Sequence, residues 1–363
     1  MPDANPASLS VFTRAAGAPG SLRSRIFSMY AALLIANVGA WIWALIAFHH
    51  YPVLLGTAFL AYTFGLRHAV DADHIAAIDN VTRKLMQQGQ RPIGVGFFFS
   101  LGHSTIVFGL SVAIATTSVV LKSRFPYLQS VGGIIGTSVS AFFLLAIAAA
   151  NFLVLISVWK TFQHVKRGGQ FVDEDLNLIL SKGGFFGRIF RNLFRLIGHS
   201  WQMYLIGLLF GLGFDTATEV GLLGISATEA AKGLSIWSIL VFPTLFTAGM
   251  ALVDSTDSIL MLGAYGWAFV KPIRKLYYNI TITVISVLVA VIVGGIEILG
   301  LLGDRLQMHG AVWDIINSLS SNFGVVGFVV IGVFAASWVI SAIIYHLNRY
   351  DDIEVNLPGE LQQ

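Results

Sequence analysis

A polar stretch within an apolar segment constrains this chain more than any other feature. The stretch RHAVDADHIAAIDN covers residues 67–80 and follows an apolar run that begins near Pro52. A segment this long and apolar is typical of a membrane span. There, each ionisable side chain at the bilayer centre costs roughly 2.5–3.5 kcal/mol on insertion scales. The ionisable groups of the stretch are Arg67, His68, Asp71, Asp73, His74 and Asp79. These groups must pair with one another, line water or hold a cation.

The composition agrees with a membrane protein that crosses the bilayer several times. Of 363 residues, 56% are hydrophobic and 11% are charged, and the mean hydropathy is +0.76. Such a balance is outside the range of soluble domains. The chain has no cysteine, so disulfides and thiolate metal sites are excluded, and a metal would need nitrogen and oxygen ligands. The small excess of basic residues is explained by topology and does not imply nucleic acid. No obligatory protein partner is evident.

The apolar runs predict an all-α polytopic protein with eight transmembrane helices. These spans are expected at about 27–48, 52–82, 92–120, 131–158, 200–223, 235–266, 277–302 and 322–346. The expected segments are an N-terminal tail (1–26), spans 1–4 (27–158), a loop (159–199), spans 5–8 (200–346) and a C-terminal tail (347–363).

The distribution of Lys and Arg predicts the orientation. With the N-terminus inside, 17 of these residues lie on the cytoplasmic side and 4 lie outside. Cytoplasmic loops carry such an excess of basic residues. The tails and the 159–199 loop are therefore expected in the cytoplasm, and the protein in the cell membrane. The first apolar run is too long for the core of a signal peptide, so we expect it to be retained.

Two pairs of segments indicate an internal repeat. FGLRHAVDADHI (64–75) resembles FGLGFDTATEVG (210–221), and FFSLGHS (98–104) resembles LFTAGMA (245–251). The two offsets, 146 and 147 residues, nearly agree. Because an odd number of spans separates the copies, the pattern predicts an inverted repeat of spans 1–3 and 4–6, plus two further helices. Transporters use this construction for alternating access to a site at the membrane midplane.

The span-2 residues form a ligand set for a divalent metal such as nickel, cobalt or zinc. At about 100° per residue, His68, Asp71 and His74 share an arc of roughly 120°, whereas Asp73 points the other way. Either Asp73 has a second partner, or the helix is broken near residues 70–72. The alternative to a metal site is an internal ion-pair network that only holds helices together.

Two residues from other spans, His103 and Asn37, lie at about the same depth in the membrane as the candidate metal ligands of span 2. His103 lies about 18 Å from the cytoplasmic anchor Arg91, and His74 about 14 Å from Arg83, at 1.5 Å per residue. We therefore expect His103 to join the span-2 histidines. Asn37 in span 1 reaches a similar depth, where an amide serves either as a ligand or as an interhelical hydrogen bond.

Spans 5 and 6 contribute four more carboxylates in apolar surroundings. They are Asp215, Glu219, Asp254 and Asp257. We expect them to form an acidic path nearer the outer side, which attracts a divalent cation and passes it to the histidines. The alternative is that they pair with Arg67 and with neighbouring hydroxyl groups.

Four segments, RHAVDADHI, LGHST, LGFDTATE and GMALVDSTDS, resemble the signature segments of the NiCoT family of nickel/cobalt transporters. The resemblance implies uptake of Ni²⁺ or Co²⁺ across the cytoplasmic membrane without ATP, and no cofactor besides the transported ion. It also implies that His68, Asp73 and His74 are essential. The family residue of span 1 that faces the second histidine biases nickel against cobalt, and Asn37 is its equivalent here.

Other functions remain open at this point. An efflux permease, or a carrier for zinc or manganese, would use the same ligands. An intramembrane metalloprotease would need H-E-x-x-H with a glutamate as general base, and the span-2 motif contains no glutamate. The chain also lacks a P-loop sequence, so ATP hydrolysis would require a partner protein.

Overall fold

The computed structural model describes residues 21–116, 120–167, 197–213, 216–268 and 272–347. Within these ranges all regular structure is helical, as the sequence predicts. The helices are α2 (Leu22–Phe48), α3 (Pro52–His68), α4 (Ala72–Gln87), α5 (Val95–Thr116), α6 (Val120–Lys166), η1 (Ser200–Gln202), α9 (Met203–Phe210), α10 (Ala217–Ala231), α11 (Ile236–Ile239), α12 (Val241–Ala268), α13 (Pro272–Arg305), α14 (Ala311–Ser320) and α15 (Phe323–Leu347).

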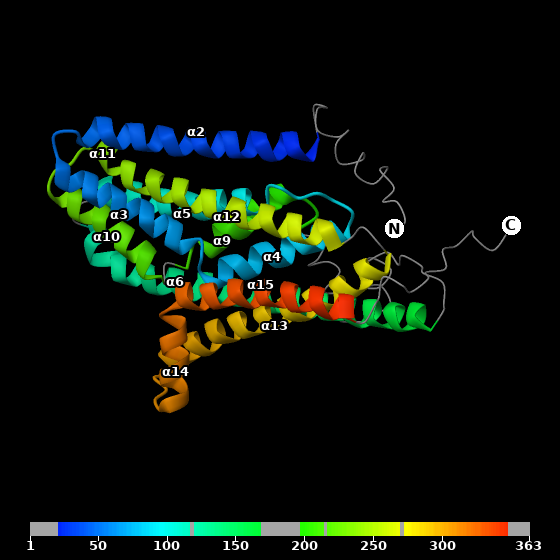
Figure 1. Ribbon diagram of the computed structural model, residues 1–363. Coiled ribbons are helices and arrows are strands. Elements are labelled where there is room, and N and C mark those ends of the chain that lie inside the picture. The colour runs from blue at the N-terminus through cyan, green and yellow to red at the C-terminus, as the bar shows by residue number, and fades with distance from the viewer. Residues whose placement is uncertain (1–20, 117–119, 168–196, 214–215, 269–271, 348–363) are drawn as a thin grey trace.

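The long helices run alongside one another, and the short helix α14 projects from the bundle between the end of α13 and the start of α15 (Figure 1). Six helical segments are long and apolar enough to cross a membrane, or seven if the bent pair α3 and α4 counts as one span. The protein is therefore a multi-pass membrane protein. The expected span 200–223 is divided between α9 and α10, which have 8 and 15 residues and are each too short alone. Eight spans thus stay a prediction. Most of the predicted 159–199 loop lies outside the described residues.

The first break divides the expected span 52–82. Helix α3 ends at His68 and α4 begins at Ala72, with a bend of 51°. Asp71 has extended backbone angles (φ −64°, ψ 144°). A Cβ added at Gly327 of α15 would overlap the carbonyl oxygen of Val70, so only glycine lets α15 pack directly on the broken segment. Of the two alternatives for span 2, the broken helix is therefore confirmed.

A second break separates α9 from α10. It follows the first by about the 146 residues that relate FGLRHAVDADHI to FGLGFDTATEVG. Asp73 and Glu219, which the repeat aligns, each lie in the first turn of the helix after a break. The matching positions of the two breaks favour an inverted repeat. They do not establish that the two halves superpose, so the repeat stays a prediction.

Close helix contacts hold the two breaks together. A Cβ at Gly96 of α5 would overlap the backbone carbonyl of Asp254 on α12, and a Cβ at Gly207 of α9 would overlap that of Phe99 on α5. Helices approach this closely only through small residues. Helix α5 therefore packs against both α9 and α12, and this packing helps to bring polar residues of five helices (α3, α4, α5, α10 and α12) around one point.

Candidate metal-binding site

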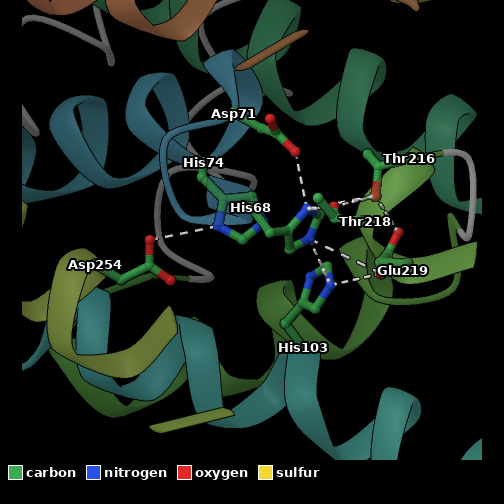
Figure 2. A network of polar contacts seen from close by, with 8 residues as sticks. All are labelled: His68, Asp71, His74, His103, Thr216, Thr218, Glu219 and Asp254. Carbon is green, nitrogen blue, oxygen red and sulfur yellow. Dashed lines mark hydrogen bonds and ion pairs between the residues drawn. The ribbon is translucent and has the colours of Figure 1, made fainter. Parts of the chain in front are cut away.

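Three histidine rings meet in the interior of the bundle (Figure 2). His68 ends α3, His74 lies in the first turns of α4, and His103 lies on α5. Their centroids are 4.6 Å (His68–His74), 4.8 Å (His68–His103) and 5.0 Å (His74–His103) apart. Each ring is at most 2% exposed. The similar depths of His103 and His74 along their helices predict this grouping.

Two of the imidazole rings pack against phenylalanine side chains. Phe99 meets His74 edge to face, with centroids 4.8 Å apart, and Phe246 packs against His68 at 5.6 Å. Both phenylalanines are fully buried. The imidazoles therefore sit in an apolar frame that restricts their rotation.

Asp71 orients the ring of His68. Its Oδ2 lies 2.8 Å from His68 Nδ1. Because an ionised carboxylate only accepts hydrogen bonds, Nδ1 is the donor. In the neutral ring the lone pair is then on Nε2, which lies 3.0 Å from His103 Nε2. Metal-binding histidines are usually held by a carboxylate in this way.

Glu219 of α10 completes a triangle of ligand atoms. Its Oε1 is 2.8 Å from His103 Nε2 and 3.9 Å from His68 Nε2, and the two Nε2 atoms are 3.0 Å apart. With metal–nitrogen bonds of about 2.1 Å, adjacent ligand atoms of an octahedron are about 3.0 Å apart and opposite ones about 4.2 Å. The three spacings therefore fit the coordination shell of one divalent ion.

A second contact joins His74 to Asp254, whose Oδ1 lies 3.4 Å from His74 Nδ1. Both side chains are fully buried. In the described part of the chain, His74 Nε2 and Asp254 Oδ2 have no hydrogen-bond partner. Buried polar atoms are rarely left unpaired. The donor set and these unpaired atoms therefore both suit a bound cation.

The cluster also contains two threonines, which the sequence analysis did not single out. The Oγ1 atoms of Thr216 and Thr218 lie 3.4 Å and 3.3 Å from His68 Nδ1. Thr216 also donates to Glu219 Oε2 at 3.0 Å. Both lie in the segment LGFDTATE. Their positions beside the acidic residues of that segment are the sequence feature that could have identified them as site residues.

Asn37 lies in α2 and is 7% exposed. Its amide nitrogen donates to the carbonyls of Leu33 and Ala248 at 2.8 Å and 3.2 Å, and its oxygen accepts from the Tyr62 hydroxyl at 3.0 Å. These contacts support the interhelical hydrogen bond proposed as one of its two roles. Its effect on metal preference stays a prediction.

The remaining candidates lie around this cluster. Asp73 is partly buried in the first turn of α4. Asp257 follows Asp254 by one turn of α12, and its Oδ2 is buried without a hydrogen-bond partner. Asp215 lies outside the described residues.

The structure changes the expected role of two acids. Glu219 and Asp254 were expected in an acidic path nearer the outer side, but they contact the imidazoles directly. The expectation treated span 5 as one continuous helix, whereas the break brings the first turn of α10 onto His103. Arg67 is exposed, and no ion pair found among the described residues includes it. This geometry gives no support to the expected pairing of the span-5 and span-6 acids with Arg67.

Comparison with known proteins gives one consistent result. The NicO family, described as high-affinity nickel-transport protein, matches residues 54–344. A high-affinity nickel transport protein of Cupriavidus necator is 59% identical over 93% of this chain and 96% of its own length. The nickel transporter NicT of Mycobacterium tuberculosis is 47% identical over 82% of this chain and 80% of its own. The cobalt transport protein NhlF of Rhodococcus rhodochrous is 41% identical over 81% and 84%. No solved structure matches.

Proposed function

Because this chain belongs to the NicO family of high-affinity nickel-transport proteins, we propose that it imports Ni²⁺ or Co²⁺ across the cell membrane without ATP. It is a transporter and not an enzyme, as the names of its close relatives indicate. The relatives include nickel and cobalt transporters, so the metal itself is part of the proposal.

The convergence of His68, His103 and Glu219 carries the proposal. Their three ligand atoms have the spacing of one coordination shell, and His74 supplies a further nitrogen within 4.8 Å of the other imidazole nitrogens. Imidazole suits Ni²⁺ and Co²⁺ better than it suits Mg²⁺ or Ca²⁺. The ligands thus favour a transition metal over the abundant hard cations.

The charge of the ion supplies the driving force. Moving two charges through the membrane potential yields about 4.6 kcal/mol per 100 mV, which makes ATP unnecessary for uptake. In this proposal both termini are cytoplasmic, eight spans are formed by counting α3–α4 and α9–α10 as one span each, and the two breaks face the ion. Asp254 and Asp257 then follow the histidines along α12 toward the cytoplasm and receive the ion on its way out of the site.

The experiment uses the full chain in proteoliposomes of defined orientation, with no nucleotide inside or outside. We expect accumulation of ⁶³Ni²⁺ under an inside-negative potential, inhibition by Co²⁺, and little inhibition by excess Mg²⁺. Accumulation that requires ATP, or that occurs only against the inward potential, would contradict import by a secondary transporter. Equal inhibition by Mg²⁺ would contradict selection by imidazole.

A further inference from the structure

Helix α4 carries buried polar side chains beyond the histidine cluster, toward the end of the bundle at which α15 ends (Figure 1). Asp79, Asn80 and Arg83 are at most 1% exposed. Gln87, the last residue of the helix, is partly buried. In the orientation proposed above, this end of α4 is cytoplasmic. These side chains therefore lie between the cluster and the compartment that receives the ion.

Two of these side chains bond to α13. Asp79 Oδ2 accepts a hydrogen bond from Ser286 Oγ at 2.6 Å. One turn further along both helices, Arg83 Nη1 donates to Thr283 Oγ1 at 2.9 Å. Both pairs are buried or partly buried, and they join α4 to α13 at two successive levels.

The other two side chains extend this contact to α6 and to the cytoplasmic end. Asn80 Oδ1 accepts hydrogen bonds from Arg83 Nη2 at 3.0 Å and from Nδ2 of Asn151 on α6 at 2.7 Å. Gln87 Nε2 donates to Oδ1 of Asn279 on α13 at 2.8 Å. We call these bonded side chains of α4, α6 and α13 the inner polar interface.

Nearer the histidine cluster, α4 and α13 meet through apolar side chains. Ile75 of α4 and both Val289 and Val293 of α13 belong to one buried apolar cluster. Polar contact begins about one turn further on, at Asp79 and Ser286. Exposing apolar surface to water is unfavourable, whereas water replaces the hydrogen bonds of polar groups that separate. The polar end of this contact therefore opens at a lower cost than the apolar end.

The helices on either side of the inner polar interface are held by closer contacts. A Cβ at Gly65 of α3 or at Gly96 of α5 would overlap a backbone carbonyl of α12. A Cβ at Gly294 of α13 would lie 3.3 Å from the carbonyl oxygen of Ala141 on α6. Helix α4 contains no glycine, and its bonds to α6 and α13 use side chains. Two tightly packed groups of helices thus meet α4, and its polar bonds to α6 and α13 are the ones that water can replace.

Asp257 connects the histidine cluster with this interface. It follows Asp254 by one turn of α12, and it lines one apolar pocket together with Ile285 of α13, the residue before Ser286. Asp79 lies close enough to Asp257 to repel it electrostatically. An ion that passes from the cluster along α12 therefore arrives beside the inner polar interface.

The following inference rests on the transport proposed above. We propose that the inner polar interface is the closed inner gate of the transport route. When α4 separates from α6 and α13 at this interface, water reaches Asp257 from the cytoplasm and the ion leaves on that side. The hydrogen bonds form again after the ion has left, and they close the route while the cluster receives the next ion.

The first test measures access to the gate without nickel. Because the chain has no cysteine, Ser286→Cys introduces a single thiol, at a side chain that is fully buried here. Inside-out vesicles receive a membrane-impermeant maleimide. In this background Thr283→Val removes an acceptor of Arg83 and should speed labelling roughly tenfold. Thr281→Val is the control, because Thr281 donates to the Tyr277 carbonyl of its own helix, and it should leave the rate unchanged.

The second test locks the gate in the full chain. Gln87→Cys with Asn279→Cys places two thiols across the interface, and a short, reducible cross-linker joins them. Cross-linking should abolish ⁶³Ni²⁺ uptake, and reduction should restore it. Ser130→Cys with Arg305→Cys is the matched control, because these side chains join α6 to α13 at 2.8 Å near the other end of α13. That cross-link should leave uptake normal, since α6 and α13 stay together.

Three kinds of result would overturn the inference. Equal labelling rates in Thr283→Val and Thr281→Val would mean that the interface does not open. Equally fast labelling from the outer side, in right-side-out vesicles, would mean that it does not face the cytoplasm. Loss of uptake in both cross-linked pairs, or in neither, would assign the movement to another interface. If the unmodified chain carries no nickel, the transport proposal fails, whereas the labelling rates still decide whether the interface opens.

Discussion

The two breaks of the bundle meet at one cluster but bring different atoms to it. The α3–α4 break supplies His68, Asp71 and His74, whereas the α9–α10 break supplies Thr216, Thr218 and Glu219 (Figure 2). Two of the three imidazoles thus belong to the first break, and the second contributes only oxygen atoms. Imidazole selects borderline metals and a carboxylate selects mainly for charge. In the proposed function, the first break therefore contributes most of the selection among metals, and the second contributes a negative charge.

One feature is common to both breaks. Each places the N-terminus of a helix beside the cluster, and this end of a helix carries a partial positive charge that disfavours a cation. Asp73 in α4 and Glu219 in α10 lie in those first turns and offset that charge. An acid thus follows each break, whereas a histidine of the cluster follows only the first.

The largest expected effect comes from the first break. His68→Ala, Asp73→Ala and His74→Ala should each reduce ⁶³Ni²⁺ uptake to background at equal protein level, because each removes a nitrogen or a charge that the second break does not replace. His50→Ala, at an exposed histidine outside the cluster, is the control and should keep normal uptake. Near-normal uptake by one of the three variants would remove that residue from the site.

A substitution at the second break should change the affinity for the metal ion more than the preference between nickel and cobalt. Glu219→Gln retains an oxygen but loses the charge, so the half-saturation concentration for nickel should rise roughly 10–100-fold, as for other losses near a metal. The ratio of nickel to cobalt uptake should change much less than in Asn37→Ala. If Glu219→Gln reversed the preference between nickel and cobalt while Asn37→Ala left it unchanged, the proposed division of roles between the two halves would be wrong.

The pH dependence of uptake distinguishes the two kinds of ligand. Protonated imidazole does not bind metal, and an unperturbed imidazole titrates near pH 6.5, about two units above a carboxylate. Uptake measured at constant membrane potential should therefore fall as the pH drops below about 6. A flat profile between pH 7.5 and 5 would show that histidine is not the limiting ligand.

Much of this arrangement is predictable from local sequence. The apolar runs locate the long helices, and equal depth along two helices brings His103 to His74. The contact between Glu219 and His103 is not predictable in this way, because it depends on the second break, and LGFDTATE contains no proline to mark one. Thr216 and Thr218 were missed for the same reason, since a hydroxyl in a continuous helix usually bonds to its own backbone.

The smallest expected effect concerns the hydroxyls of the second break. Thr218 Oγ1 lies 3.3 Å from His68 Nδ1, whereas Asp71 Oδ2 lies 2.8 Å from the same atom. Because a charged acceptor at a shorter distance binds the ring more strongly, Asp71 determines the orientation of His68 and Thr218 only assists. Asp71→Ala should therefore weaken nickel binding by at least about tenfold, while Thr218→Val, which keeps the shape of the side chain, should weaken it only about two- to threefold. Calorimetric titration of the purified protein with Ni²⁺ measures both. A larger loss in Thr218→Val than in Asp71→Ala would mean that the second break holds the imidazole, and the assignment of orientation to the first break would then be wrong.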